Sequence, residues 1–307
     1  MIKIIGETNV DFIGRRKLAF TVSAVMVAIG LFAAIQVARG QGNLAIEFTG
    51  GTMLQGAFAE SVSTAELRTI LADGGFQEVE IKALVSRETP NSFLIRVKED
   101  ATGEARSAET MVELLHRALP DNHFEVDSMH EVGPSVGRLL QSQARNAVII
   151  AMFCILVYIW FRFDFRSGVA ATIATFHDVF VVLGLLYLLQ REISLLVVTG
   201  LLTLAGYSLT DTVVVFDRIR ENLKQFRRRS DFGATINRSI NEVLSRTIIT
   251  TITTQIVVVI LLIFGGEVLF DFALTLLLGF LVGTYSSWFV ASPVVVEWEQ
   301  RKPSRFK

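Results

Sequence analysis

The chain has 307 residues and a formal net charge of -1, and it is 51% hydrophobic and only 19% charged. Ordinary soluble domains carry about 25% charged residues. The apolar residues also gather in blocks, which is typical of a membrane protein and excludes a single soluble domain. The one cysteine, Cys154, lies in an apolar run and cannot form an intramolecular disulfide.

Six apolar stretches are long enough to cross a hydrocarbon core of about 30 Å as helices. In chain order they are 18–38, 147–161, 168–189, 195–216, 247–264 and 268–296. The second is short, but 139–145 can extend it into the membrane interface. The first stretch follows Arg15, Arg16 and Lys17 but is longer than the roughly 7–15 residues of a signal-peptide core, so we predict an uncleaved span.

Lysine and arginine residues gather at alternate ends of these spans, which predicts that both termini are cytoplasmic. On the opposite side, the short connections contain only Arg191, beside Glu192, and the acidic Glu267. The predicted organisation is a cytoplasmic segment 1–17, a first span 18–38, an extracytoplasmic domain 39–138, a five-helix membrane region 139–297 with a cytoplasmic loop at about 217–246, and a cytoplasmic tail 298–307. In that loop, the basic cluster Arg227–Arg229 is expected to contact lipid headgroups.

The extracytoplasmic domain has a pattern of strand, helix, strand, strand, helix and strand. The predicted elements are 44–58, 64–71, 78–85, 92–98, 104–119 and 123–132, with a turn at 86–91. Gly50 and Gly51 predict a bulge or bend within 44–58. Ser63 and Glu66 have the spacing of a capping box at the start of the first helix. This order is the split β-α-β motif of ferredoxin-like α+β domains. The domain shows no nucleophile, base and acid set, so we predict a binding or spacer module.

Asp211 interrupts the fourth apolar stretch, with apolar residues on both sides. An ionisable residue inside a span is costly and indicates a functional site. At helical steps Tyr207, Thr203 and Gly200 share its face, which suits a helix interface or a wet crevice.

Arg246 opens the fifth span, and Thr250 lies on the same face one turn further on. If the fourth and fifth helices are antiparallel neighbours, Asp211 and Arg246 could meet and offset part of each other's desolvation cost. Burial favours the protonated acid and a guanidinium favours the carboxylate, so a change in water access could switch the carboxyl group. The alternative is a static ion pair that only fixes packing.

Two further features lie inside the spans. His177 and Asp178 in the third span are either neighbours of a proton path or a polar packing pair. Gly279 and Gly283 in the sixth span have GxxxG spacing and predict close packing against a helix that the sequence does not identify. We expect no metal and no cofactor, with protons as the coupling ion.

Several runs of residues closely resemble the SecF family of protein-export membrane proteins, and the resemblance covers essentially the whole chain. They are 163–166 (FDFR), 176–178 (FHD), 206–222 (GYSLTDTVVVFDRIREN), 47–52 (EFTGGT), 245–247 (SRT) and 264–266 (FGG). The long run in the fourth span is the most specific, whereas FTGG is shared with the sister SecD family.

The resemblance implies a subunit of the resistance-nodulation-division superfamily in the bacterial inner membrane, with a periplasmic domain. It implies SecD as the partner in a twelve-span unit that associates with the SecYEG channel and with YidC. Such a unit uses the proton-motive force to promote preprotein export. Asp211 matches the essential membrane aspartate of the family, and Arg246 matches the arginine near it. No nucleic acid and no enzymatic reaction are implied.

Two other functions remain open from the sequence. One is half of a small-molecule or lipid exporter of the same superfamily, although such exporters usually carry twelve spans in one chain. The other is a structural membrane subunit without proton coupling. An intramembrane hydrolase is not favoured, because the chain contains no HExxH motif.

Overall fold

The computed structural model describes residues 8–76, 79–84, 91–98, 108–225 and 231–303. The chain divides into two compact units. Met1–Asn43 and Ala147–Lys307 form the first, and Leu44–Asn146 form the second. We call them the membrane unit and the sheet unit.

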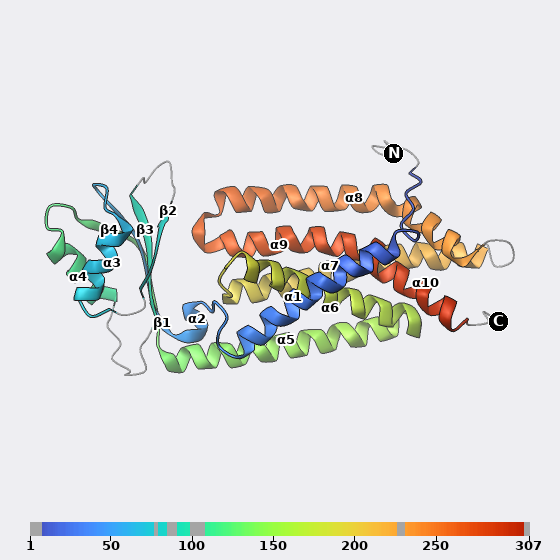
Figure 1. The fold of residues 1–307 in the computed structure, drawn as a ribbon, viewed down its shortest axis with the longest axis horizontal. Helices are drawn as coiled ribbons and strands as arrows, with labels where there is room; N and C mark the ends of the chain where they lie inside the picture. The colour runs from blue at the N-terminus through green and yellow to red at the C-terminus, as the bar shows by residue number, and fades with distance from the viewer. Residues whose placement is uncertain (1–7, 77–78, 85–90, 99–107, 226–230, 304–307) are drawn as a thin grey trace. The chain divides into compact units, whose positions relative to one another are not determined.

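The membrane unit is built from long helices that run alongside one another (Figure 1). Six helices of the described residues are long and apolar enough to cross a membrane. They are α1 (Arg16–Ala38), α5 (Pro134–Arg162), α6 (Phe165–Leu188), α7 (Leu195–Gln225), α8 (Phe232–Phe264) and the last one, which comprises α9 (Gly266–Ser286), the π-helical turn η1 (Ser287–Ala291) and α10 (Ser292–Arg301). This is a multi-pass membrane protein.

Two of these helices extend well beyond their apolar stretches. α7 continues to Gln225, as expected from the charged residues 217–221 that prolong the fourth span, but α8 already begins at Phe232, so most of the expected loop 217–246 is helical. Asp231 caps α8, since its carboxylate accepts a hydrogen bond from the Ala234 N–H at 3.3 Å. Hydropathy marks only the lipid-crossing part of a helix and misses a polar extension that packs on protein. The cluster Arg227–Arg229 lies outside the described residues.

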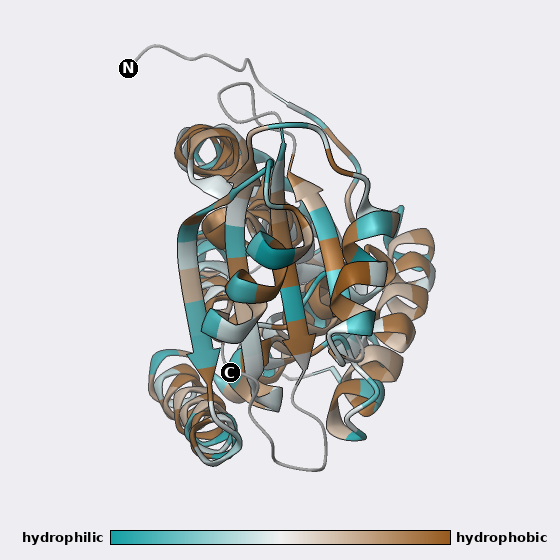
Figure 2. Cartoon of the chain, turned by 90° about the vertical axis from the view of Figure 1, so that its left-hand side faces the viewer, coloured by the Kyte–Doolittle hydropathy of each residue, from teal (hydrophilic) through white to brown (hydrophobic). Residues whose placement is uncertain are grey.

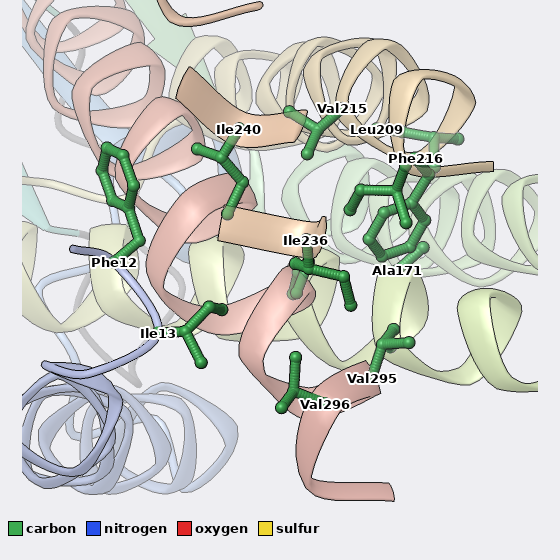
Figure 3. Close-up of a cluster of buried hydrophobic side chains, with 14 of the residues drawn as sticks. Phe12, Ile13, Ala171, Leu209, Val215, Phe216, Ile236, Ile240, Val295 and Val296 are labelled. Atoms are coloured by element: carbon green, nitrogen blue, oxygen red, sulfur yellow. The ribbon is translucent and has the colours of Figure 1, made fainter. Parts of the chain in front are cut away.

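A cluster of buried apolar side chains holds this extension in place (Figure 3). Ile236 and Ile240 of α8 are fully buried there with Phe12, Ile13 and Val296. The segment before α1 is also tied to α8 by polar contacts. The Asn237 side chain accepts from the Phe12 N–H at 2.8 Å and donates to the Val10 carbonyl oxygen at 3.0 Å.

α1 and α6 cross at two glycines. A Cβ atom added to Gly30 would lie 1.9 Å from the Phe180 carbonyl oxygen, and one added to Gly184 would lie 2.8 Å from the Gly30 nitrogen. Such distances are far below van der Waals contact, so any side chain at Gly30 would force the helices apart. Small residues that permit this approach are a common device of membrane helix packing.

The sheet unit is a four-stranded antiparallel sheet with two longer helices. Its elements are α2 (Ile46–Thr49), β1 (Gly51–Phe58), α3 (Thr64–Asp73), β2 (Val79–Leu84), β3 (Ser92–Lys98), α4 (Ala108–Ala118) and β4 (Phe124–Val132). The strand order is β2-β3-β1-β4, and every neighbouring pair is antiparallel. The strands carry both apolar and polar residues (Figure 2). Leu54 and Ile95 pair across β1 and β3 in a core that includes Leu67 and Leu115.

The starts of α3 and β1 differ in how well the sequence predicted them. The predicted cap is confirmed, because the Ser63 hydroxyl accepts from the Glu66 N–H at 3.1 Å. The prediction of one continuous strand over 44–58 is wrong, since Ile46–Thr49 form a helical turn and the strand begins at Gly51. Gly50 has φ 81° and Gly51 has φ 134°, conformations that turn the chain and that other residues rarely adopt. Most of the predicted turn 86–91, and the first four residues of the predicted helix 104–119, lie outside the described residues.

Replacing Ile240 by alanine should lower the free energy of unfolding by about 2–5 kcal/mol, because the side chain is fully buried and leaves a cavity. Denaturant unfolding of the purified protein in detergent measures this loss. Ile252→Ala is the matched control in the same helix, since Ile252 is 53% exposed. It should cost no more than about 0.5 kcal/mol, and equal losses would contradict the assignment of Ile240 to the core.

Candidate functional site

Two carboxyl groups are buried inside the membrane unit on neighbouring helices. Asp178 of α6 is 0% exposed and Asp211 of α7 is 7% exposed. They are close enough for their charges to interact. A buried carboxyl in a membrane helix is expensive unless polar groups surround it, so its neighbours define the site.

Asp178 collects hydrogen bonds from two other helices. The Ser286 hydroxyl of α9 donates to Asp178 Oδ2 at 2.7 Å, and the Ser208 hydroxyl of α7 donates to the same oxygen. The other oxygen, Oδ1, lies 2.8 Å from Nδ1 of His177, which is itself buried. The carboxyl group of Asp178 therefore links three helices, α6, α7 and α9, at a single point.

Asp211 is less fully satisfied. The side chains of Ser287 and Thr284 lie near its carboxyl group, but their hydroxyls bond to the Thr284 carbonyl oxygen and to Thr251 Oγ1 respectively. Its Oδ2 atom is buried and has no hydrogen-bond partner among the described residues. Nearly all buried polar atoms in folded proteins are paired. This oxygen is one of a few described exceptions, which also include Nε2 of His177 and Oγ1 of Thr212.

A line of hydroxyl groups runs from α7 to α9 beside Asp211. The Tyr207 hydroxyl donates to Thr251 Oγ1 of α8 at 3.2 Å, and Thr251 Oγ1 lies 2.8 Å from Thr284 Oγ1 of α9. These hydrogen bonds join α7, α8 and α9 in one polar cluster, and Thr284 lies near the carboxyl group of Asp211. Side-chain hydroxyls often link membrane helices in this way.

The last span is distorted at the site. The π-helical turn η1 begins at Ser287, directly beside Asp211, and Pro293 follows in the first turn of α10. Proline has no N–H, and its ring clashes with the carbonyl group four residues earlier, so the helix must widen or bend there. The Ser292 hydroxyl instead donates to the Ser287 carbonyl oxygen at 2.8 Å. Single π turns inside longer helices are frequent at functional sites.

The structure brings together some of the predicted site residues and not others. Asp211, Tyr207, His177 and Asp178 belong to the cluster described above. The side chains of Thr203, Thr250 and Arg246 are exposed. The two threonines donate to carbonyl groups of their own helices, Thr203 to Thr199 at 2.9 Å and Thr250 to Arg246 at 3.1 Å.

Arg246 makes no ion pair within the described part of the chain, whereas Arg218 and Arg238 pair with Glu242. The predicted Asp211–Arg246 contact is therefore not present in this conformation. Among the described residues there is also no group of three or more histidine, cysteine, aspartate or glutamate side chains that could hold a metal ion.

The polar partners of the two acids were missed by sequence reasoning. They are Ser208, Thr251, Thr284, Ser286 and Ser287. The available signal was a set of hydroxyl residues within otherwise apolar spans, above all the pair Ser286–Ser287. That signal is weak, because serine and threonine can satisfy their hydroxyls on their own helix.

The two glycines of the sixth span pack against α7. A Cβ atom added to Gly279 would lie 3.0 Å from Leu204 Cδ1, and one added to Gly283 would lie 3.2 Å from Ser208 Cβ and 3.7 Å from Asp178 Oδ2. The helix that the sequence left unidentified is therefore α7. Gly283 lets α9 come close enough for Ser286 to reach Asp178.

These features define a polytopic membrane protein with a buried acidic site, and comparisons with known proteins identify its family. Residues 112–301 match the family model described as protein export membrane protein SecD/SecF, C-terminal. The chain is 47% identical over 297 residues to protein translocase subunit SecF of Thermodesulfovibrio yellowstonii, covering 96% of this chain and 97% of that protein. It is 37% identical over 303 residues to protein translocase subunit SecDF of Thermus thermophilus. The chain belongs to the SecD/SecF family of protein export membrane proteins.

Solved structures agree with this assignment. The crystal structure of SecDF from Thermus thermophilus, a translocon-associated membrane protein, superimposes with a TM-score of 0.81 at 36% identity and covers 98% of this chain. A crystal structure of SecDF in a super-membrane-facing form gives a TM-score of 0.68 at 37% identity. The chain spans 40% of the length of each of these SecDF chains.

Replacing Gly283 by valine should lower the free energy of unfolding by about 1–3 kcal/mol, because its side chain would press on Ser208 and separate α9 from α7. Unfolding of the purified variant in detergent measures the loss. The matched control is Gly206→Val in α7, where an added Cβ has no neighbour within 4 Å. A Gly206 variant that is as unstable as the Gly283 variant would contradict the close packing.

Proposed function

We propose that this chain is the SecF subunit of a bacterial Sec translocase and that, together with SecD, it uses the proton-motive force to promote preprotein export across the cytoplasmic membrane. The family assignment supports the export role, since relatives at 47% and 37% identity are named as protein translocase subunits. The match to 40% of a SecDF chain supports SecD as the partner that supplies the remainder. SecYEG, YidC and the translocating preprotein are the further proposed partners, by the family resemblance.

One observation carries the proton-coupling part of the proposal. Asp211 is a buried carboxyl in a membrane span, and its Oδ2 atom has no partner among the residues that the structure describes. A carboxyl group that is only partly satisfied can take up a proton at little structural cost. Each charge that crosses a membrane potential of 100 mV releases about 2.3 kcal/mol, which is enough to bias a conformational equilibrium strongly.

The proposed role of Arg246 requires a second conformation. Arg246 and Asp211 lie on α8 and α7, which contact each other, but the arginine is exposed here. We propose that Arg246 approaches the Asp211 carboxylate after the proton leaves, and that protonation releases it. The two SecDF structures match this chain to different extents, with TM-scores of 0.81 and 0.68, which supports more than one conformation in the family.

The proposed orientation follows from the distribution of charge. Both termini and the α7–α8 connection would lie in the cytoplasm, because lysine and arginine residues gather there. The sheet unit would then be periplasmic. Its strand order, β2-β3-β1-β4 with helices after β1 and β3, supports the ferredoxin-like assignment.

Replacing Asp211 by asparagine should abolish the part of preprotein export that depends on the proton-motive force, because the amide cannot bind and release a proton. Export is measured in cells that carry the variant as their only copy, with and without an uncoupler. Asp217→Asn is the matched control, since Asp217 lies on the same helix but is exposed. Uncoupler-sensitive export that survives in the Asp211 variant would favour a structural subunit without proton coupling.

Replacing Arg246 by glutamine should also remove uncoupler-sensitive export, because the carboxylate of Asp211 would lose its proposed cation. Arg238→Gln on the same helix is the comparison, since Arg238 is exposed and pairs with Glu242. It should retain at least half of the wild-type export. If the Arg246 variant exports as well as the Arg238 variant, the proposed pairing is wrong while the role of Asp211 can stand.

A further inference from the structure

Asp178 is the most deeply buried acid of the membrane unit, and the proton step proposed above does not use it. It is 0% exposed and accepts hydrogen bonds on Oδ2 from Ser208 and Ser286, which belong to two different helices. Hydrogen bonds to a charged or strongly polar acceptor in a dry interior are among the stronger ones in proteins. Asp178 is thus the point at which α6, α7 and α9 are joined.

Ser286 links Asp178 to the neighbourhood of Asp211. It is the last residue of α9, and Ser287, the next residue, begins the π turn and lies near the carboxyl group of Asp211. Two consecutive serines therefore serve two different acids. Whatever fixes the position of Ser286 also fixes where the hydroxyl of Ser287 lies relative to Asp211.

Both serines have a second acceptor within reach. The Ser286 hydroxyl lies 3.0 Å from the Gly283 carbonyl oxygen, and the Ser287 hydroxyl lies 2.9 Å from the Thr284 carbonyl oxygen. A hydroxyl has one proton and can donate it to only one acceptor at a time. Without Asp178, Ser286 would donate to its own helix, and the junction between α9 and η1 would lose its anchor.

We propose that Asp178 is a positioning residue for Asp211: by holding Ser286 and Ser208, it sets where the π turn begins and so keeps Thr284 and Ser287 beside the proton-binding carboxyl group. The inference rests on the proposed function for the role of Asp211 as the proton-binding group. The anchoring of the junction itself does not depend on it.

The groups that face Asp178 are few. From α6 there is His177, from α7 there are Ser208 and Asp211, and from α9 there is Ser286. Tyr285 of α9 lies against His177, with ring centroids 6.4 Å apart, and its hydroxyl is 3.3 Å from Ser23 of α1. No lysine or arginine pairs with Asp178 within the described residues, so its neighbours are hydroxyls and one imidazole.

The chemistry of asparagine separates positioning from proton carriage at this residue. In Asp178→Asn the amide oxygen can accept from both serines, and the amide N–H can donate to Nδ1 of His177 in its other neutral tautomer. The anchor is kept while the titratable group is lost. Asp178→Ala removes both, and Ser286→Ala removes one of the two interhelical hydrogen bonds.

The first test is hydrogen–deuterium exchange of the full chain in detergent, followed on peptides that cover 283–292. Asp178→Ala and Ser286→Ala should raise the equilibrium constant for local opening of this segment by on the order of tenfold. This is the effect expected when one hydrogen bond to a charged acceptor is removed. Asp178→Asn and Asp211→Asn should exchange like the wild type. Thr210→Ala is the control, because Thr210 is exposed and bonds only to the Gly206 carbonyl oxygen of its own helix. Unchanged exchange in Asp178→Ala would overturn the proposal.

The second test is the dependence of uncoupler-sensitive export on external pH. Asp178→Ala and Ser286→Ala should shift the pH at which export is half-maximal by roughly one pH unit. Asp178→Asn and Thr210→Ala should leave this pH unchanged. If Asp178→Asn loses export as completely as Asp211→Asn does, Asp178 carries a proton itself and the positioning role is wrong. If the pH midpoint of Asp178→Ala is unchanged, the junction between α9 and η1 does not position groups around Asp211. If Asp211→Asn itself exports normally, the proposed function fails, while the exchange experiment still decides whether Asp178 anchors the junction.

Discussion

The free-energy cost of burying a carboxyl group among apolar helices constrains the whole membrane unit. Asp178 and Asp211 each need polar neighbours, and most of these come from adjoining helices. The hydroxyls of α7, α8 and α9 meet this need. Since a hydroxyl must lie within about 3 Å of its acceptor, the helices have to approach closely, and Gly283 allows α9 to do so.

The two acids are satisfied to different degrees, and this difference divides their roles. Asp178 accepts hydrogen bonds from two helices and has no exposed surface, so it stabilises one arrangement of α6, α7 and α9. Asp211 keeps one buried oxygen without a partner in the described structure and sits beside the π turn. A fully bonded acid suits an anchor, whereas a partly bonded acid beside a distorted helix suits a group that changes its protonation state.

Much of the architecture could be predicted from the sequence, because hydrophobic length is a strong signal. All six spans lie within long helices, and Asp211 stood out as an acid with apolar residues on both sides. The polar beginning of α8 was missed because its burial comes from contacts with Phe12 and Ile13, which precede α1. The helical turn Ile46–Thr49 was missed because Gly50 and Gly51 were taken as a bend within one strand.

The partners of the acids could not be predicted for a different reason. Helical periodicity shows which residues of one helix share a face, but not which residue of another helix lies opposite. The pairing of Ser286 with Asp178 joins residues 108 positions apart in the chain, and that of Tyr207 with Thr251 joins residues 44 apart. The outward position of Arg246 depends on the same interhelical geometry, so it followed only from the structure.

Infrared difference spectroscopy of the purified protein in lipid, recorded while the pH is changed, tests most directly whether Asp211 gains and loses a proton. The account predicts a carbonyl band of a protonated carboxylic acid that titrates in the wild type and in Asp217→Asn and that is absent from Asp211→Asn. Identical spectra for the wild type and Asp211→Asn across the titration would contradict it.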